Sequence, residues 1–250
     1  MAEEQKYASE VIDLPSEGKL YPENSPLREG KIDLKYMTAK EEDILTSQNL
    51  IKKGVVIEKL LDSLILTKGV KCNDLVLGDK NAVMVAARIL AYGPEYECEV
   101  TNPNTGNVHS HTFNLADCPF KKIGKDISEN NFEFELPISK TKITFKVLTG
   151  QDEKDIEKEL EQFGKLGTDV KPELTTRLRY MVTSVDGESS NPKINTFIQS
   201  MLSRDSLALR SEVIRVSPDI ELEQEVSMEG DTVKVAIPMP VNFFWPNSGI

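Results

Sequence analysis

Two histidines and two cysteines in the first half of the sequence are the residues whose types could bind a metal ion. His109 and His111 are two positions apart on a predicted strand, so their side chains project to the same face, and Cys98 and Cys118 lie on or beside the same predicted hairpin. Four thiolate and imidazole ligands are typical of structural zinc. The spacing argues against this site, because the cysteines form no Cys-x-x-Cys pair and two histidines on one strand are not a zinc-ribbon signature. We therefore expect no metal and no other cofactor.

The same four residues have a simpler structural interpretation. In it the histidines are solvated and pair across the hairpin with Glu97 or Glu99, while the cysteines serve as small apolar residues. A zinc-dependent enzyme or regulator centred on this hairpin is the more remote alternative.

The sequence contains none of the compact motifs that carry catalysis. No glycine-rich phosphate loop, metallohydrolase helix motif or nucleophile elbow occurs, and Asp79 in Gly78-Asp79-Lys80 is better suited to capping a helix. The acidic run at residues 152–161 is interleaved with lysines at helical spacing, which is typical of the solvated face of a helix. We expect no catalytic residues and no enzyme.

The last residues hold the densest aromatic cluster. Phe243, Phe244 and Trp245 follow a proline-spaced extended segment at residues 238–240. One hypothesis is a terminal strand whose aromatic side chains close the core of the second half. The other is an anchor that enters a pocket on a partner, because buried aromatic side chains dominate many interfaces. These three residues are our partner-binding candidates.

The charge and the apolar content exclude two classes of partner. Lys and Arg number 30 against 41 Asp and Glu, which gives a net charge of −11 and disfavours binding to nucleic acid. No apolar signal core opens the sequence and no stretch approaches the roughly 18 apolar residues that cross a membrane. Three cysteines are too few and of the wrong parity for a disulfide framework. We expect a soluble protein of a reducing cytoplasm.

The first half of the chain predicts an α+β unit. Residues 1–13 carry little apolar periodicity and are expected to form a flexible N-terminal arm. Alternation at residues 31–36 predicts a strand, and Thr38 with Glu41 forms a capping box that opens a helix. Further helices are predicted at residues 55–66 and, capped by Asp79, up to Tyr92, and a hairpin follows at residues 96–115.

The second half repeats this order of elements. Residues 31–38 and 142–149 are identical at four of eight positions, and both precede a capped helix. Helices are then predicted at residues 173–185, after Asn191-Pro192, and from Asp205 as a cap, followed by a second hairpin near residues 220–237. We interpret the chain as an internal duplication of one α+β unit. The predicted boundaries are an arm at 1–13, a first unit at 14–120, a linker at 121–127 and a second unit with the aromatic C-terminal segment at 128–250.

Several short motifs follow one another in a recognisable order: Leu14-Pro-Ser-x-Gly-x-x-Tyr-Pro22, Thr38-Ala-Lys-Glu-Glu-Asp-Ile-Leu45, residues 79–93, and Asn242-Phe-Phe-Trp-Pro246. In these motifs and their order the chain resembles the baseplate hub assembly proteins of T-even-type contractile-tailed bacteriophages. Some relatives carry Cys-x-x-Cys pairs in the hairpins, whereas Cys98 has no near partner here and residues 221–237 contain no cysteine.

The resemblance implies a non-catalytic role in building the baseplate hub. Members act as chaperone-like assembly factors or as structural parts of the hub. We therefore expect an assembly factor in the cytoplasm of the infected bacterium, with other hub proteins as partners and a homo-oligomer as a possible state. The alternative within this class is a permanent component of the virion baseplate.

Overall fold

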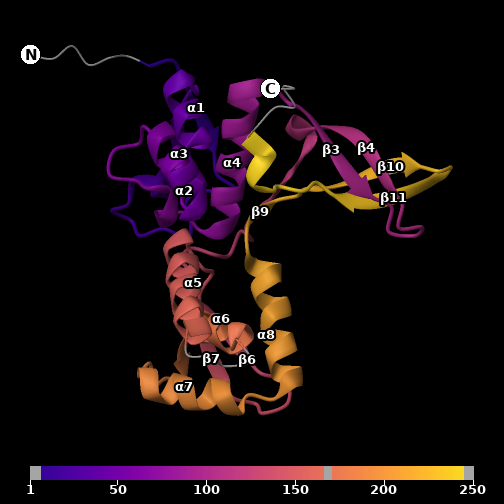
Figure 1. Cartoon of the computed structure of the whole chain (residues 1–250). Coiled ribbons are helices and arrows are strands. Elements are labelled where there is room, and N and C mark those ends of the chain that lie inside the picture. Colours follow the sequence, from indigo (N-terminus) through magenta and orange to yellow (C-terminus); the bar gives the residue numbers. More distant parts are fainter. Residues whose placement is uncertain (1–6, 166–170, 245–250) are drawn as a thin grey trace, which may run out of the picture.

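The computed structural model describes residues 7–165 and 171–244, and it mixes α-helices with small antiparallel sheets. This confirms the α+β class. Figure 1 shows the helices α1–α4 of the first half at one end of the molecule and the helices α5–α8 of the second half at the other end. Both β-hairpins, β3–β4 and β10–β11, project together to one side.

The first half begins with a pair of antiparallel strands, β1 and β2, continues through four helices and ends in a hairpin. Its elements are β1 (Ser9–Asp13), β2 (Lys31–Lys35), α1 (Ala39–Thr46), α2 (Gln48–Lys52), α3 (Val56–Leu64), α4 (Leu77–Tyr92), β3 (Glu95–Thr101), β4 (Val108–Asn114) and β5 (Phe120–Lys121), with short 3-10 turns η1 (Pro26–Glu29), η2 (Cys72–Asp74) and η3 (Leu115–Asp117).

The second half has a similar succession, with a third strand added to its sheet. Its elements are β6 (Phe132–Glu135), β7 (Lys142–Phe145), α5 (Gly150–Lys165), α6 (Glu173–Met181), β8 (Val182–Val185), α7 (Asn191–Ser200), α8 (Ser203–Val216), β9 (Asp219–Ile220), β10 (Glu223–Met228), β11 (Asp231–Ala236) and the 3-10 helix η4 (Val241–Phe244). Strand β7 lies between β6 and β8, and both pairings are antiparallel.

Long-range pairing changes three of the predicted segments. Within the expected N-terminal arm, Ser9–Asp13 pairs with β2 as strand β1. The helix expected over residues 173–185 ends at Met181, because Val182–Val185 pairs with β7 as strand β8. Where the first unit was expected to end and the linker to begin, Phe120–Lys121 pairs with β9, and Ile123 within the expected linker is buried.

Two buried aspartates do not cap helices, contrary to prediction. Helix α4 begins at Leu77 and α8 at Ser203, so Asp79 and Asp205 lie in the first turns of these helices. The Asp79 carboxylate accepts hydrogen bonds from the backbone N–H and hydroxyl of Ser16, at 2.9 and 2.5 Å, and burial raises its pKa. The Asp205 carboxylate accepts from two backbone N–H groups in the β6–β7 turn. Each aspartate therefore fastens a strand-to-strand loop to a helix.

The two halves share one hydrophobic core and are joined by backbone contacts. Strand β5 of the first half pairs with β9 of the second, and the N–H of Gly150 donates to the carbonyl of Leu75 at 2.9 Å. Helix α4 approaches the chain before β9 closely at Gly78, where an added Cβ would lie 1.8 Å from the carbonyl oxygen of Pro218. Only glycine permits this contact without a shift of the backbone.

Candidate functional site

The paired hairpins pack against each other through their apolar faces. In β3–β4 the buried positions alternate with exposed ones, as the period of a strand requires, and include Tyr96, Val100 and Phe113. In β10–β11 the buried positions include Val226 and Val233. Hydrogen bonds join the hairpins at both ends, from the loop at residues 102–107 to Glu229 and from Gln224 to the carbonyl of Asn114, so the two buried faces lie against each other and each hairpin keeps an outer face.

The structure brings only two of the four metal candidates together. Cys98 and His111 lie directly opposite each other in the β3–β4 pairing, and the ring of His111 packs edge-on against a phenylalanine. His109 and Cys118 contact residues of the second hairpin instead. In the described part of the chain, no group of three His, Cys, Asp or Glu residues has a geometry that could hold a metal ion. The zinc alternative stays a prediction that purified protein must test.

A glutamate at the tip of the second hairpin locks the two hairpins together. The Glu229 carboxylate accepts hydrogen bonds from Asn102 Nδ2 at 3.0 Å, Thr105 Oγ1 at 2.8 Å and Asn107 Nδ2 at 2.7 Å. His109 Nε2 lies 3.4 Å from Glu229 Oε1, so this histidine does not pair with Glu97 or Glu99 as expected. The hydrogen bonds from Asn107 and Thr105, with the nearby His109, lower the pKa of Glu229.

Sequence reasoning missed Glu229. The sequence indicates a turn here through the pair Glu229-Gly230. In the structure both residues have positive φ, 54° and 94°. That signal identifies a tight turn but not its partner in the other hairpin.

The C-terminal aromatic cluster packs on the first half of the chain. Phe243 and Phe244 are both 0% exposed in the 3-10 helix η4, and the ring of Phe243 lies edge-on to Tyr96 at a centroid distance of 5.0 Å. The hypothesis of a terminal strand that closes the core of the second half is therefore wrong. The segment is a 3-10 helix, and Phe243 contacts Tyr96 and Arg88 of the first half. A partner could reach these two rings only if η4 left its site. Trp245 lies outside the described residues, and its docking on a partner stays a prediction.

A buried arginine holds this C-terminal segment. Arg88 is 4% exposed, and its guanidinium donates to the carbonyl of Phe243 at 3.1 Å and to the carbonyls of Gly93 and Glu95. It also lies over the ring of Tyr92, at 5.0 Å from the centroid. Burial lowers the pKa of Arg88. One feature of the sequence could have indicated this role: Arg88 directly follows Ala87, a residue on the apolar face of the predicted helix.

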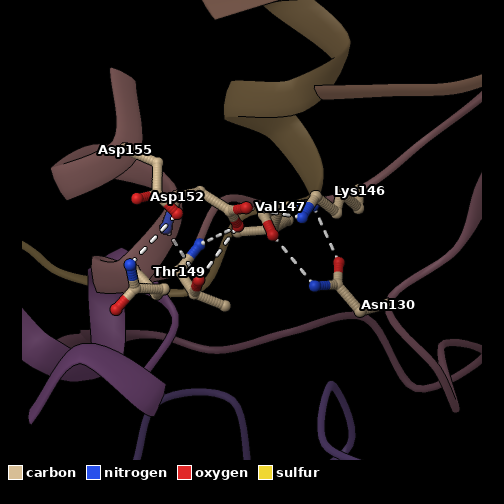
Figure 2. Close-up of polar contacts among 7 residues, drawn as sticks. Asn130, Lys146, Val147, Thr149, Asp152 and Asp155 are labelled. Atoms are coloured by element: carbon tan, nitrogen blue, oxygen red, sulfur yellow. Dashed lines mark hydrogen bonds and ion pairs between the residues drawn. The ribbon is translucent and has the colours of Figure 1, made fainter. Parts of the chain in front are cut away.

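Matching polar networks fix the start of the first helix in each half. The Glu41 carboxylate accepts from the N–H and hydroxyl of Thr38, which confirms the predicted capping box, and forms an ion pair with Lys35 at 2.7 Å. In the second half, Asp152 accepts from the N–H and hydroxyl of Thr149, both at 2.9 Å. Figure 2 shows this second network, in which Lys146 also pairs with Asp152 at 2.7 Å.

Helix α8 presents an unusual face to solvent. Leu207 and Ile214, seven residues apart, are 57% and 67% exposed. Residues seven apart lie on one side of a helix, so these two side chains form a single apolar stripe. The exposed positions of α8 contain no acidic residue: Ser203, Arg204, Leu207, Arg210, Ser211, Ile214 and Arg215. In a chain with a net charge of −11, this face is both apolar and cationic.

A groove of about 640 Å³ continues this face. Ile214 lines it, together with Met181, Leu222 and Lys121 among others. The groove runs between the second-half helices and the β9 segment, where the two halves meet. The groove is lined by both signs of charge, with Glu153, Asp219, Glu221 and Glu223 beside Lys121 and Arg177, so the cationic character belongs to the α8 face and not to the groove.

Comparison with known proteins identifies a family. The family model described as T4 bacteriophage base plate protein matches residues 7–245, a span that contains both halves, both hairpins and η4. The chain belongs to this family. The match confirms the resemblance to baseplate proteins of T4-type phages. No curated protein and no solved structure matches the chain.

Membership associates this base plate protein with the phage baseplate, an assembly that contains other baseplate proteins. Among the described helices, none is long and apolar enough to cross a bilayer.

Proposed function

We propose that this base plate protein is a non-catalytic assembly factor for the central hub of the baseplate. It acts like a chaperone, through contacts with other hub proteins in the cytoplasm of the infected bacterium. The observation that carries the proposal is the apolar and cationic face of α8, with Leu207 and Ile214 exposed beside the groove. Exposed apolar patches on a protein surface are typical of sites of protein contact.

The uses of the buried acidic side chains support a non-catalytic role. Asp79, Asp205 and Glu41 are 0–1% exposed, and each accepts hydrogen bonds that fasten a loop or a helix start. A general acid or base must reach a substrate, and these carboxylates are occupied within the fold.

We also infer that the two halves arose by duplication of one unit. The support is a set of matching interactions at matching places. Asp79 accepts from the N–H of the second residue after Leu14, and Asp205 from the N–H of the second residue after Leu136. Leu14 and Leu136 are both buried and both precede a proline. The paired networks of Glu41 and Asp152 add a second match.

The second candidate function is a permanent component of the virion baseplate. The family description favours it, because it names a base plate protein rather than a transient factor. Both candidates require the same contacts with hub proteins, and they differ in whether the chain remains in the finished particle.

Infection by a phage that lacks this gene tests the role in assembly. We expect complete baseplates to be lost while their separate subunits still accumulate, because a missing factor blocks a step of association and not synthesis. Sedimentation and electron microscopy of infected-cell extracts measure this, and the wild-type gene supplied in trans is the control that should restore baseplates. Normal numbers of baseplates without the gene would contradict the proposal.

A further inference from the structure

The outer face of the first hairpin has the opposite character to the α8 face. Glu95, Glu97 and Glu99 are exposed at alternate positions of β3, so all three side chains project from the same side. Their cross-strand partners are Asn114, Thr112 and Ser110, none of them cationic. Like charges in a row on one strand repel one another, so a cationic surface placed against them is stabilising.

The same hairpin face also carries an apolar side chain. Val108, at the start of β4, is 59% exposed and lies opposite Thr101, two residues beyond Glu99 and therefore on the same face of the hairpin. The hairpin face is thus acidic with an exposed apolar end, whereas the α8 face is cationic with an apolar stripe. Figure 1 shows that the hairpins project from the body, which leaves this face open to another molecule.

The two faces also match in length. Helix α8 has 14 residues, or roughly 21 Å at 1.5 Å per residue, and β3 has 7 residues, or roughly 23 Å at 3.3 Å per residue. Arg204 and Arg210 are separated by about 9 Å along the helix axis, and Glu95 and Glu99 by about 13 Å along the strand. Each exposed arginine can therefore face a different glutamate.

We propose that a second copy of this chain docks on α8 through the outer face of its first hairpin. Arg204 and Arg210 of one protomer pair with the Glu95, Glu97 and Glu99 row of the next, while Ile214, which lies beyond Arg210 on the helix, covers the exposed end near Val108. The contact is head-to-tail, so repeated docking forms an open chain of copies. The copy at one end of this chain keeps its α8 face free for the hub contact proposed above, so either candidate function is compatible with the contact.

The proposed contact is small and dependent on charge. A seven-residue hairpin face against four helical turns lies at the low end of interface sizes, where association is weak and reversible. Two copies that each carry a net charge of −11 repel each other. At 0.15 M salt the Debye length is about 8 Å, so this repulsion is largely screened at longer distances. Direct charge pairs at the contact persist under these conditions.

Sedimentation velocity of the full chain at about 5 to 500 µM tests the proposal in 0.15 M salt. We expect the average mass of the wild type to rise with concentration. The variant R204E/R210E and the variant E95K/E99K should each associate at least about tenfold more weakly. An equimolar mixture of the two variants should restore association, because each charge-reversed face then meets a face of opposite charge.

The matched control is K52E/K53E, which changes the net charge as R204E/R210E does but lies at the exposed end of α2. It should associate as the wild type does. A wild type that stays monomeric throughout the range would overturn the proposal, as would variants that associate normally or a mixture that does not recover. Circular dichroism of each variant separates a lost contact from a lost fold.

Discussion

Replacing Phe243 and Phe244 together by alanine is expected to lower the melting temperature by more than about 10 °C. Both rings are 0% exposed and touch each other at a centroid distance of 5.4 Å. Removing one buried phenylalanine costs about 3–5 kcal/mol, and in a chain of this size each kcal/mol shifts the melting temperature by about 2–4 °C. The two losses are not fully additive because the rings are in contact. Thermal unfolding followed by circular dichroism measures the shift.

The matched control for this prediction is Val108→Ala, since Val108 is an apolar residue that is 59% exposed on the other side of the hairpin. Its effect should remain within about 0.5 kcal/mol. An unchanged melting temperature in the double phenylalanine variant would show that η4 does not contribute to the core. Trp245→Ala completes the series, because a stable variant that fails to support assembly would point to docking of Trp245 on a partner.

Glu41→Ala should destabilise the protein by about 3–5 kcal/mol, whereas Asp152→Ala should cost only about 1 kcal/mol. The two carboxylates occupy matching positions, but Lys35 and Glu41 are 6% and 0% exposed, while Lys146 and Asp152 are 31% and 15% exposed. Removing Glu41 leaves a buried ammonium without a partner, which is strongly unfavourable. Lys146 can turn toward water instead. Urea denaturation of both variants gives the comparison.

The ion pair of Glu41 with Lys35 also predicts that the stability of the protein depends on pH. Burial alone would raise the pKa of Glu41, but the hydrogen bonds from Lys35, Thr38 and Ser63 outweigh it and lower the pKa to about 2. A folded-state pKa below the unfolded value of 4.5 stabilises the protein above pH 4.5, and this contribution is lost as the pH falls toward 2. The shift corresponds to about 3 kcal/mol.

Glu41→Gln should therefore unfold with a weaker dependence on pH between 4.5 and 2 than the wild type. Equal slopes of stability against pH in the two proteins would contradict the assignment. The double variant Lys35→Met/Glu41→Leu should recover most of the stability lost in Glu41→Ala, since it removes both buried charges.

Local patterns predicted the elements whose stability is local. The capping box at Thr38 and Glu41, the hairpin over residues 96–115 and the end of α4 at Tyr92 all depend on residues within one or two turns. The predicted helix over residues 173–185 failed at its end because Val182 and Val185 pair with β7, a contact between residues about forty positions apart. Helical propensity carries no information about such a partner.

The candidate surfaces were predicted less well than the fold. Asp79 and Asp205 were identified as helix caps, but their carboxylates bind loops more than sixty residues away in sequence. Arg88 and Glu229 were not identified, because each gains its role from the C-terminal segment or from the other hairpin. The cationic face of α8 depends on which side of the helix the core covers, and the spacing of Leu207 and Ile214 alone does not decide that.

Counting this chain in purified virions and in isolated hub intermediates tests the central claim most directly. Quantitative mass spectrometry against a labelled standard of the full chain gives the copy number in both. A transient assembly factor is expected in the intermediates and in only substoichiometric amounts in the virion. A fixed whole number of copies in every virion, equal to the number in the intermediates, would contradict the claim and identify the chain as a permanent part of the baseplate.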